Sequence, residues 1–431
     1  MFDSPAESMS VDERAEVQTL RLRGLVDRLL AADGVQAQRL RAAGVTAGLE
    51  LSLGDLRGLP TTSKTDLWEH YPFGLLCVPR EQLVTIHGSS GTGGRPTLVG
   101  YTAVDLELWA QMCARSLACA GATAGSLVHN AYGYGLFTGG LGIHQGAVRL
   151  GATVVPVSGG MTTRQLTLLR DLAPTILTCT PSFAVHLGES ASAAGIDLGS
   201  LRAGLFGAEP WSEAMRAQIE SVLPLKALDI YGLAEVIGPG VATECLEAQR
   251  GLHVNEDHFY VEALDPATGD PVADGSPGEL TFSTLTKEAL PLLRYRSGDV
   301  ASLRKGSCAC GRTLVRMSKV LGRRDDMLVI RGVNVFPSEV EAVLLADPRV
   351  SPHYLLVVDR RAAQPELRVC CEVDGVTTGG DARLQAALAD RLGLRADVVG
   401  LPAGTVPRQE VGKAVRLIAW DGGDPPVPGL T

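Results

Sequence analysis

The middle of the chain alternates short apolar runs with helix-like segments, and this alternation restricts the fold more than any other feature of the sequence. Apolar runs at 127–130, 151–157 and 175–179 have the length of buried strands. Helical patterns separate them, as at 165–172, which Pro174 closes. Strands that alternate with helices form a largely parallel sheet that is covered on both faces. Ligands of such sheets bind beyond the carboxyl ends of the strands.

The two ends of the chain have other patterns. Residues 10–43 have the apolar period of helices. From about residue 258 to 303, strands alternate with turn signals, which predicts an antiparallel β subdomain. Residues 326–431 contain two ββα-like units. We therefore expect an α/β protein with a large N-terminal domain of mixed and parallel sheets (1–321), a hinge (322–326) and a small mobile C-terminal α+β domain (327–431).

The composition argues against several classes of protein. The 431 residues are 45% hydrophobic and 20% charged, which is typical of a globular chain. A net charge of −9 argues against binding to nucleic acid phosphates. No apolar stretch is long enough to span a membrane, and residues 1–16 lack the pattern of a signal peptide. We expect a cytoplasmic protein with no nucleic-acid or membrane partner.

A glycine-rich stretch between two β-rich runs is a candidate ligand-binding loop. Residues 87–97 contain four glycines and four hydroxyl residues, so the backbone can approach a ligand closely and offer it several donors. Arg95 adds a planar cation that suits phosphate oxygens. The spacing matches neither a P-loop NTPase nor a dinucleotide fingerprint. Two interpretations remain at this point: a loop that holds nucleotide phosphates, and a turn that joins two hairpin strands.

Six short segments, in order along the chain, resemble the motifs of the adenylate-forming (acyl/aryl-CoA synthetase) superfamily. Within it, the chain is most similar to the phenylacetate-CoA ligase family. Any one segment is weak evidence, whereas six in the right order are very specific. They are residues 89–97, 207–210, 231–235, 295–299, 322–326 with 330–337, and 412–413.

The resemblance implies a two-step reaction. A carboxylate attacks the α-phosphorus of ATP, which releases pyrophosphate and leaves an acyl-adenylate. The C-terminal domain then rotates, and the thiol of coenzyme A displaces AMP. ATP, Mg²⁺ and CoA are therefore expected, and the family suggests a homodimer.

The first step joins two anions, so cations and N–H donors are needed around the phosphates. The resemblance implies that Arg95 acts on the phosphates and that Glu235 holds Mg²⁺. Alternatively, Glu235 is a surface carboxylate. The family usually has Thr and Lys where this chain has Gly93 and Arg95, which removes one donor, worth about 0.5–1.5 kcal/mol. The other loop residues expected to hold phosphates are Ser89, Ser90, Gly91, Thr92, Gly93 and Gly94.

Other motifs imply contacts to the nucleoside. Tyr231 would stack on adenine, or else pack in the core. Asp299 would accept the ribose hydroxyls, or else serve as a capping or turn residue. Arg323 would approach the ribose or phosphates, or else form an ion pair at the domain joint. Ala208, Glu209 and Gly232 complete the expected nucleotide site.

The catalytic lysine implied by the resemblance is Lys413, near the end of the chain. Because it lies so far along the sequence, it must reach the site by domain closure. Its charge would bridge the carboxylate and the α-phosphate; the alternative is a solvated lysine. Asp325 would absorb the dihedral change between the two poses as a hinge residue, or else act as a capping residue.

The acid is expected to bind at the loop 131–140, because this loop follows the carboxyl end of a strand. Tyr132, Tyr134 and Phe137 can form flat walls for an aromatic ring, although aromatics packed in the core would give the same pattern. We place Gly207 with them. A short, flat pocket favours an aryl or arylacetic acid over a fatty acid.

A second constellation suggests a metal. Cys308 and Cys310 form a C-x-C pair in a turn, and Cys245 and His253 from a nearby loop would complete a Cys₃His set suited to structural zinc. Some relatives in the resembled family carry zinc at matching positions. His258 is the competing histidine. The alternative is two reduced thiols in a surface turn.

Two other functions stay open. The first is an adenylating enzyme that uses a carrier-protein thiol or an amine as acceptor, or a substrate anion other than a carboxylate; an assay of CoA dependence would separate it from a CoA ligase. The second is a non-catalytic nucleotide-binding protein, against which the presence of both Glu235 and Lys413 argues.

Overall fold

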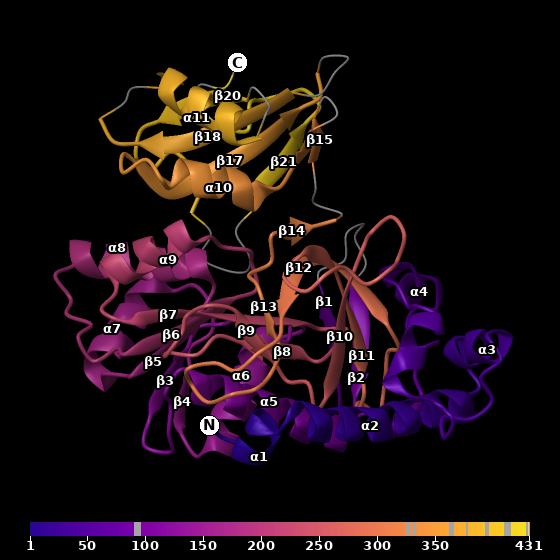
Figure 1. Ribbon diagram of the computed structural model, residues 1–431. Helices are drawn as coiled ribbons and strands as arrows, with labels where there is room; N and C mark the ends of the chain where they lie inside the picture. Colours follow the sequence, from indigo (N-terminus) through magenta and orange to yellow (C-terminus); the bar gives the residue numbers. More distant parts are fainter. Residues whose placement is uncertain are drawn as a thin grey trace.

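The chain forms a large N-terminal body and a smaller C-terminal domain that lies against it (Figure 1). The computed structural model describes residues 1–89, 96–324, 328–330, 333–361, 366–375, 378–392, 396–408, 415–427 and 430. The candidate residues Ser90, Gly91, Thr92, Gly93, Gly94, Arg95, Asp325 and Lys413 therefore lie outside the described residues.

Helices form the N-terminal part, as the sequence predicts. Ser10 and Glu13 make a reciprocal capping box that starts α2 (Val11–Ala32). The buried face of this helix carries Leu22, Leu25, Val26 and Leu29. The other elements of this part are α1 (Ser4–Ser8), α3 (Val35–Ala42), η1 (Leu53–Gly58), α4 (Lys64–Glu69) and η2 (Arg80–Gln82).

One long mixed sheet forms the centre of the N-terminal body. Its strand order is β10-β11-β12-β13-β9-β8-β7-β6-β5-β3-β4, and β14 also pairs with β12. The strands from β4 to β7 pair in parallel, which confirms the prediction for the middle of the chain. The strands are β3 (Leu127–Asn130), β4 (Thr153–Pro156), β5 (Ile176–Cys179), β6 (Ala203–Gly207), β7 (Lys226–Leu233), β8 (Gly238–Thr243), β9 (Leu252–Val254), β10 (Phe259–Leu264), β11 (Pro277–Thr284), β12 (Tyr295–Arg304), β13 (Arg316–Met317) and β14 (Gly322–Arg323).

Helices connect the parallel strands and cover the sheet. In Figure 1, α8 and α9 lie above strands β5 to β7, and α5 and α6 lie below. Thr102 and Asp105 form the predicted capping box at the start of α5. The helices are α5 (Ala103–Cys119), α6 (Gly139–Leu150), α7 (Thr162–Leu172), α8 (Pro181–Ala193) and α9 (Glu213–Val222).

The parallel strands contain a point at which the strand order reverses. The strand β3 pairs with β4 on one side and with β5 on the other, and the chain then continues through β6 to β7. Crevices for ligands form outside the carboxyl ends of the strands at such a point. The loops that follow β3, β5, β6 and β7 are therefore brought to the same edge of the sheet.

The antiparallel strands predicted near residues 258–303 are present, and they continue the parallel sheet instead of forming a separate one. The strand β12 makes this connection, because it pairs with β11, with β13 and with β14. The strands β13, β9 and β8 then lead to β7. A hairpin of β1 (Thr85–Ser89) and β2 (Thr97–Tyr101) stands apart from this sheet.

The C-terminal domain has its own sheet and core, as the ββα-like pattern predicts. Its five strands follow the order β19-β20-β18-β17-β21. Buried side chains such as Val340, Leu356 and Val369 form the core. The elements are β15 (Leu328–Ile330), β16 (Val333–Val335), α10 (Pro337–Leu344), β17 (Val350–Asp359), β18 (Glu366–Val373), β19 (Gly379–Gly380), α11 (Ala382–Leu392), β20 (Asp397–Leu401) and β21 (Leu417–Trp420).

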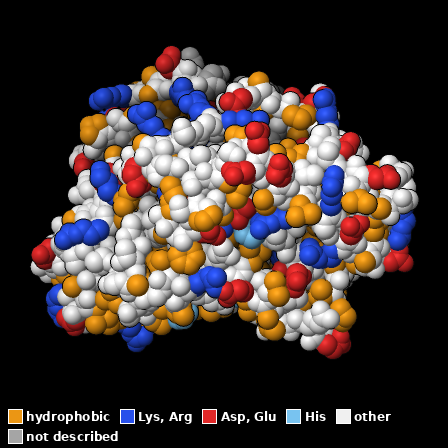
Figure 2. Space-filling model, turned by 60° about the horizontal axis from the view of Figure 1, so that its bottom comes forward, with side chains coloured by type: hydrophobic (Ala, Val, Ile, Leu, Met, Phe, Trp, Pro, Cys, Tyr) orange, Lys and Arg blue, Asp and Glu red, His pale blue; other side chains and the backbone are white. Residues whose placement is uncertain are grey.

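The surface is mixed in character. On the face drawn in Figure 2, acidic and basic side chains are interspersed with scattered hydrophobic ones. Among the described residues, no helix combines the length and the apolar character that a membrane span requires.

Candidate functional site

The hairpin that carries the glycine loop lies against the turn after β7. Ser89 ends β1, and its Oγ donates a hydrogen bond of 2.8 Å to Oε1 of Glu235, which is 4% exposed. Ser89 pairs with Thr97 across the hairpin, so the strand β1 ends beside this carboxylate. Residues from two distant motifs therefore meet at one place, and the alternative of a surface carboxylate for Glu235 does not hold.

A buried lysine that sequence reasoning missed lies behind Glu235. Lys287 is 0% exposed, and its Nζ donates a hydrogen bond of 3.0 Å to the main-chain oxygen of Glu235. Nζ also lies 4.9 Å from the ring centroid of Tyr101. Burial lowers the pKa of Lys287 to about 8. A lysine that follows an apolar strand is ordinarily solvated, so no local pattern distinguishes this one.

Three residues from three of the resembling segments, 231–235, 295–299 and 322–326, meet between β7, β12 and β14. The Tyr231 hydroxyl donates a hydrogen bond of 2.6 Å to Oδ2 of Asp299. Arg323 Nη1 lies 3.1 Å from Oδ1 of the same carboxylate, and the two residues are direct partners across β12 and β14. The Tyr231 ring also stacks on Phe282, with centroids 5.9 Å apart. Burial raises the pKa of the Tyr231 hydroxyl well above its usual value.

The turn after β6 and the adjoining strand β7 leave no space for larger residues at two glycines. A Cβ on Gly207 would lie 2.1 Å from the main-chain oxygen of Ile230, and one on Gly232 would lie 1.8 Å from that of Gly238. Ala208 has a φ of 72°, which is rare for a residue with a side chain. The turn is thus held close against the neighbouring strand.

The next residue of this turn, Glu209, is tied to the start of α8. Its Oε1 accepts hydrogen bonds from the N–H of Ser182 at 2.8 Å and from the Ser182 hydroxyl at 2.5 Å. The carboxyl ends of β5 and β6 are therefore fixed to one another.

The three aromatic residues of the loop after β3 have different surroundings. Tyr132 is buried, and its hydroxyl bonds the main-chain oxygen of Leu205 at 3.3 Å. The Tyr134 hydroxyl accepts a hydrogen bond of 2.8 Å from Asn130, and its centroid lies 5.9 Å from that of His144. Phe137 is 56% exposed. Tyr132 is thus set in the core, whereas the other two rings lie progressively farther out.

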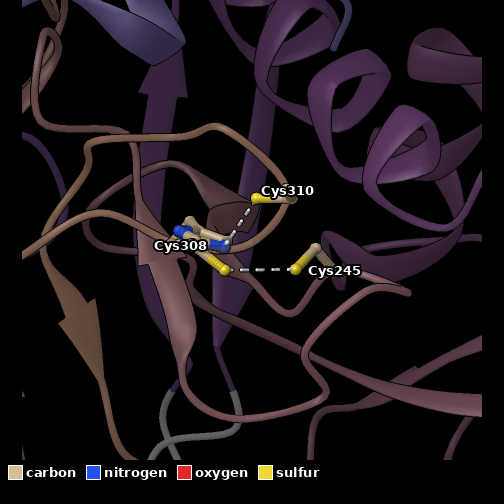
Figure 3. Close-up of side chains that lie close together, drawn as sticks. Cys245, Cys308 and Cys310 are labelled. Atoms are coloured by element: carbon tan, nitrogen blue, oxygen red, sulfur yellow. Dashed lines mark hydrogen bonds between the residues drawn. The ribbon is translucent and has the colours of Figure 1, made fainter.

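The three cysteines of the second constellation lie together (Figure 3), and His253 completes the group. Cys245 Sγ and Cys308 Sγ are 3.8 Å apart, and Cys310 Sγ is 3.5 Å from Nε2 of His253. All four ligand atoms lie within 4.8 Å of one another. His258 is held elsewhere, because its ring contacts Asp257 and Thr286.

The spacing of these atoms fits a tetrahedral ion better than a disulfide. Sulfur ligands about 2.3 Å from zinc lie about 3.8 Å apart in a tetrahedron, whereas disulfide sulfurs are about 2.0 Å apart. Burial raises the pKa of Cys310, but hydrogen bonds from His253 and Arg312 outweigh it and lower the pKa to about 5. The donor set therefore matches a closed Cys₃His site with one thiol already disposed to ionise.

The turn that carries Cys308 and Cys310 is fastened to the first helix. Arg312 Nε lies 2.5 Å from Oε2 of Glu7, and both side chains are buried. The N–H of Thr313 also bonds the main-chain oxygen of Glu7 at 3.2 Å. The C-x-C turn and α1 thus form one structural unit.

The C-terminal domain contacts the N-terminal body through α8 and α9. Glu341 of α10 accepts a hydrogen bond of 2.8 Å from the N–H of Ser212, which caps α9. His353 Nε2 lies 3.2 Å from Oε2 of Glu189 in α8. At the joint between the domains, a Cβ on Gly322 would lie 2.1 Å from the Phe336 ring.

A cavity of about 230 Å³ lies between the two domains. Ser182 lines it from the N-terminal body, next to the Glu209 turn. Arg408 and Val415, which flank the segment 409–414, line it from the C-terminal domain. Arg408 and Val415 therefore line the same cavity as Ser182, which is the hydrogen-bond partner of Glu209.

Comparison with known proteins identifies the family. Residues 27–286 match the family described as AMP-binding enzyme, and residues 332–419 match the AMP-binding enzyme C-terminal domain. Phenylacetate-coenzyme A ligase of Thermus thermophilus is 47% identical over 97% of this chain and 99% of its own. Phenylacetate-coenzyme A ligase of Escherichia coli is 47% identical over 96% of both chains.

Solved structures of one relative also indicate a conformation. 2-Hydroxyisobutyryl-CoA ligase in its postadenylation state, in complex with an acyl-adenylate, has a TM-score of 0.88 and 29% identity over 96% of this chain and 91% of its own. The same ligase in its thioesterification state has the same identity and coverage but a TM-score of 0.72. The arrangement of this chain is therefore more similar to the postadenylation state of that ligase than to its thioesterification state. The chain belongs to the phenylacetate-CoA ligase family of AMP-binding, adenylate-forming enzymes.

Proposed function

We propose that this protein is an AMP-forming ligase that adenylates an aromatic acid with ATP and then transfers the acyl group to coenzyme A. The observation that carries the proposal is the 47% identity, over almost the whole chain, to phenylacetate-coenzyme A ligases. The names of these relatives specify phenylacetate, which is an arylacetic acid. The convergence of Ser89, Glu235, Tyr231 and Asp299 in the fold supports the same proposal.

The phosphate end of the site rests on the glycine loop and on Glu235. We infer that Ser89, the segment 90–94 and Arg95 hold the departing phosphates. The buried Glu235 carboxylate suits Mg²⁺, because hard divalent cations prefer carboxylate oxygens. When bound there, the ion would spread the phosphate charge as the carboxylate attacks. Ser89 would orient the Glu235 oxygen toward the loop through the bond it already makes.

The nucleoside end rests on two groups of residues. Tyr231 and Asp299 share a hydrogen bond, and Arg323 pairs with the same carboxylate, which supports a site for the adenine and the ribose hydroxyls. We infer that the base lies close to the main chain of the turn after β6, which comprises Gly207, Ala208 and Glu209. Gly232 lies beside this turn. The ion pair with Asp299 holds the guanidinium of Arg323 at this end of the proposed site.

We infer that the acid lies near Gly207 and the loop after β3. Tyr134 is the aromatic residue best placed to contact it, because it is half-buried at the carboxyl end of β3 beside Asn130. Tyr132 would form the floor from the core, and Phe137 would stand at the mouth.

The proposed division is 1–321 for the N-terminal domain, 322–326 for the hinge and 327–431 for the lid that carries Lys413. Gly322 and Arg323 pair with β12, so the pivot is best sought at Asp325. The drop in TM-score between two states of one relative supports such a rotation. Lys413 would neutralise the carboxylate and α-phosphate in the first pose and leave in the second.

We further propose that Cys245, His253, Cys308 and Cys310 hold a structural zinc ion. Four protein ligands leave no open position, so the ion would stabilise the fold and take no part in the chemistry. We also propose that the protein acts in the cytoplasm as a homodimer; light scattering of the purified protein would test the dimer.

The deciding experiment is ATP–pyrophosphate exchange with a panel of aromatic acids, because it reports adenylation whatever the acceptor is. We expect exchange with arylacetic or aryl acids, and CoA-dependent release of AMP with the same acid. Lys413→Ala should abolish exchange. If that variant exchanged pyrophosphate as the wild type does, the proposed mechanism would be wrong; if AMP release did not depend on CoA, another acceptor would be indicated.

A further inference from the structure

Lys287 has no role in the site described so far, yet its burial is complete. It belongs to the segment after β11, and its Nζ donates to the main-chain oxygen of Glu235 at 3.0 Å. The ring of Tyr101 lies on another side, with its centroid 4.9 Å from Nζ. A fully buried ammonium is unfavourable unless nearby groups compensate its charge. The burial of the Lys287 ammonium at this position therefore needs a physical explanation.

The segment that carries Lys287 is fixed on both sides. The Asp105 carboxylate, which caps α5, accepts hydrogen bonds from the N–H groups of Glu288 at 2.7 Å and Ala289 at 2.9 Å. Arg28 of α2 donates to the main-chain oxygen of Lys287 at 2.9 Å. The main chain around Lys287 is thus fixed by contacts other than the one to Glu235, and these contacts set the position of its side chain.

The turn that bears Glu235 is held at several points. The Tyr101 hydroxyl lies 3.2 Å from the main-chain oxygens of both Ala234 and Ile237. Lys287 holds the oxygen of Glu235 between them, and Ser89 holds its carboxylate. The carboxylates of Asp105 and Glu235 are both buried, so the ammonium between these segments also balances charge.

We propose that Lys287 is a positioning residue for Glu235: it fixes the main chain of the turn so that the carboxylate faces the glycine loop before a divalent ion arrives. This inference rests on the proposed function, because it takes Glu235 as a magnesium ligand. Partners that orient a metal ligand in this way change metal affinity or activity about 10- to 100-fold when they are removed.

The test compares two variants of similar volume. Lys287→Met removes the donor and the charge, whereas Lys287→Gln retains an N–H donor. Pyrophosphate exchange is measured against Mg²⁺ concentration at saturating ATP and acid. We expect Lys287→Met to raise the Mg²⁺ concentration for half-maximal exchange about tenfold, and Lys287→Gln to recover part of this loss. Thermal melting checks that each variant folds, and if Lys287→Met does not fold, Lys287→Gln against wild type carries the test.

Leu285→Ala provides the matched control. Leu285 is buried two residues away on the same segment and packs in the N-terminal cluster, so its loss weakens the fold without removing the bond to Glu235. Two results would overturn the positioning role. In the first, folded Lys287→Met needs no more Mg²⁺ for half-maximal exchange than Leu285→Ala does. In the second, Lys287→Gln and Lys287→Met need the same Mg²⁺ concentration. If the wild type exchanged no pyrophosphate with any acid, the proposed function itself would fail instead.

Discussion

Asp299 is central to the proposed nucleoside site. Its two carboxylate oxygens bind two different partners, the Tyr231 hydroxyl and the Arg323 guanidinium, and it is 6% exposed. A buried carboxylate that bonds a cation and a phenol is fixed in orientation. The same oxygens would therefore meet ribose hydroxyls in a set geometry.

Asp299→Asn keeps the shape of this side chain and removes its charge. Hydrogen bonds to charged groups are worth about 1.5–3 kcal/mol, so we expect the KM for ATP to rise roughly tenfold or more. Steady-state kinetics at saturating acid and CoA would measure it. Asp390→Asn, on the exposed face of α11, serves as the control. An unchanged KM in Asp299→Asn would argue that this carboxylate only joins the strands.

The lowered pKa of Lys287 also predicts that the free energy of unfolding depends on pH. Burial lowers the pKa of its ammonium to about 8, whereas an unfolded lysine titrates at about 10.4. Between these values the unfolded chain binds a proton that the folded chain lacks, so the contribution of this lysine to the free energy of unfolding rises with pH. Lys287→Met loses that rise.

The measurement is urea unfolding of the wild type and Lys287→Met at pH 7.5 and at pH 10. The stability of the variant relative to the wild type should fall by up to about 3 kcal/mol over this window. An equal difference at both pH values would show that the lysine titrates normally in the folded protein.

Among the elements, the C-x-C turn joins two parts of the fold that are far apart in sequence. Cys308 and Cys310 lie beside Cys245 and His253, and Arg312 ties the same turn to Glu7 of α1. A metal that closes such a turn contributes binding free energy to folding. Loss of the proposed zinc ion would thus loosen the N-terminal helix as well as the turn.

We expect purified protein to contain about one zinc ion per chain, measured by mass spectrometry. Removal by a strong chelator, or Cys310→Ser, should lower the melting temperature by several degrees. Cys77→Ser is the control, since Cys77 lies outside the cluster. Metal-free wild type with an unchanged melting temperature would exclude a structural ion here.

Elements with local signals were predictable from the sequence. The capping box of Thr102 and Asp105 starts α5 as expected, and the C-x-C pair found its Cys and His partners. The resemblance assigned Ser89 and Glu235 to one ATP site, and the structure shows a hydrogen bond between them that was not predicted. Lys287 was not predictable, because its burial depends on tertiary contacts with Tyr101 and Asp105 that leave no periodic signal.

At the scale of the whole molecule, α10 and the start of β17 meet the N-terminal body. Glu341 accepts a hydrogen bond from the Ser212 N–H, and His353 lies beside Glu189. The arrangement is similar to the postadenylation state of a relative, and less similar to its thioesterification state. These contacts therefore belong to one of the two poses.

Glu341→Ala should weaken that pose and slow adenylation selectively. One hydrogen bond is worth about 1 kcal/mol, so we expect pyrophosphate exchange to fall about fivefold. Thioester formation from supplied acyl-adenylate should be unaffected. Rapid-quench assays of the two half-reactions would separate them, with Asp390→Ala as the control on the same domain. Equal slowing of both steps would mean that the contact does not select a pose.

The existence of two domains was predictable, because the hydrophobic pattern changes after residue 326. Their relative placement was not, since it rests on single contacts such as Gly322 with Phe336 that no sequence pattern marks. The continuity of the sheet was missed for a related reason. The sequence pattern around each strand indicates whether it pairs in parallel or antiparallel. It does not tell which strand joins the parallel part of the sheet to the antiparallel part.

The shared use of β12 limits how this protein can be rebuilt. The strand β12 pairs with β11, β13 and β14. In a chimera of two related ligases, a breakpoint inside the large body would therefore separate paired strands and leave main-chain hydrogen-bonding groups without their partners. A breakpoint just before β15 cuts no ladder of the long sheet, since the β15–β16 pair and the five-stranded sheet both lie beyond it. Transplanting that lid from a related ligase is thus the recombination that the architecture tolerates best.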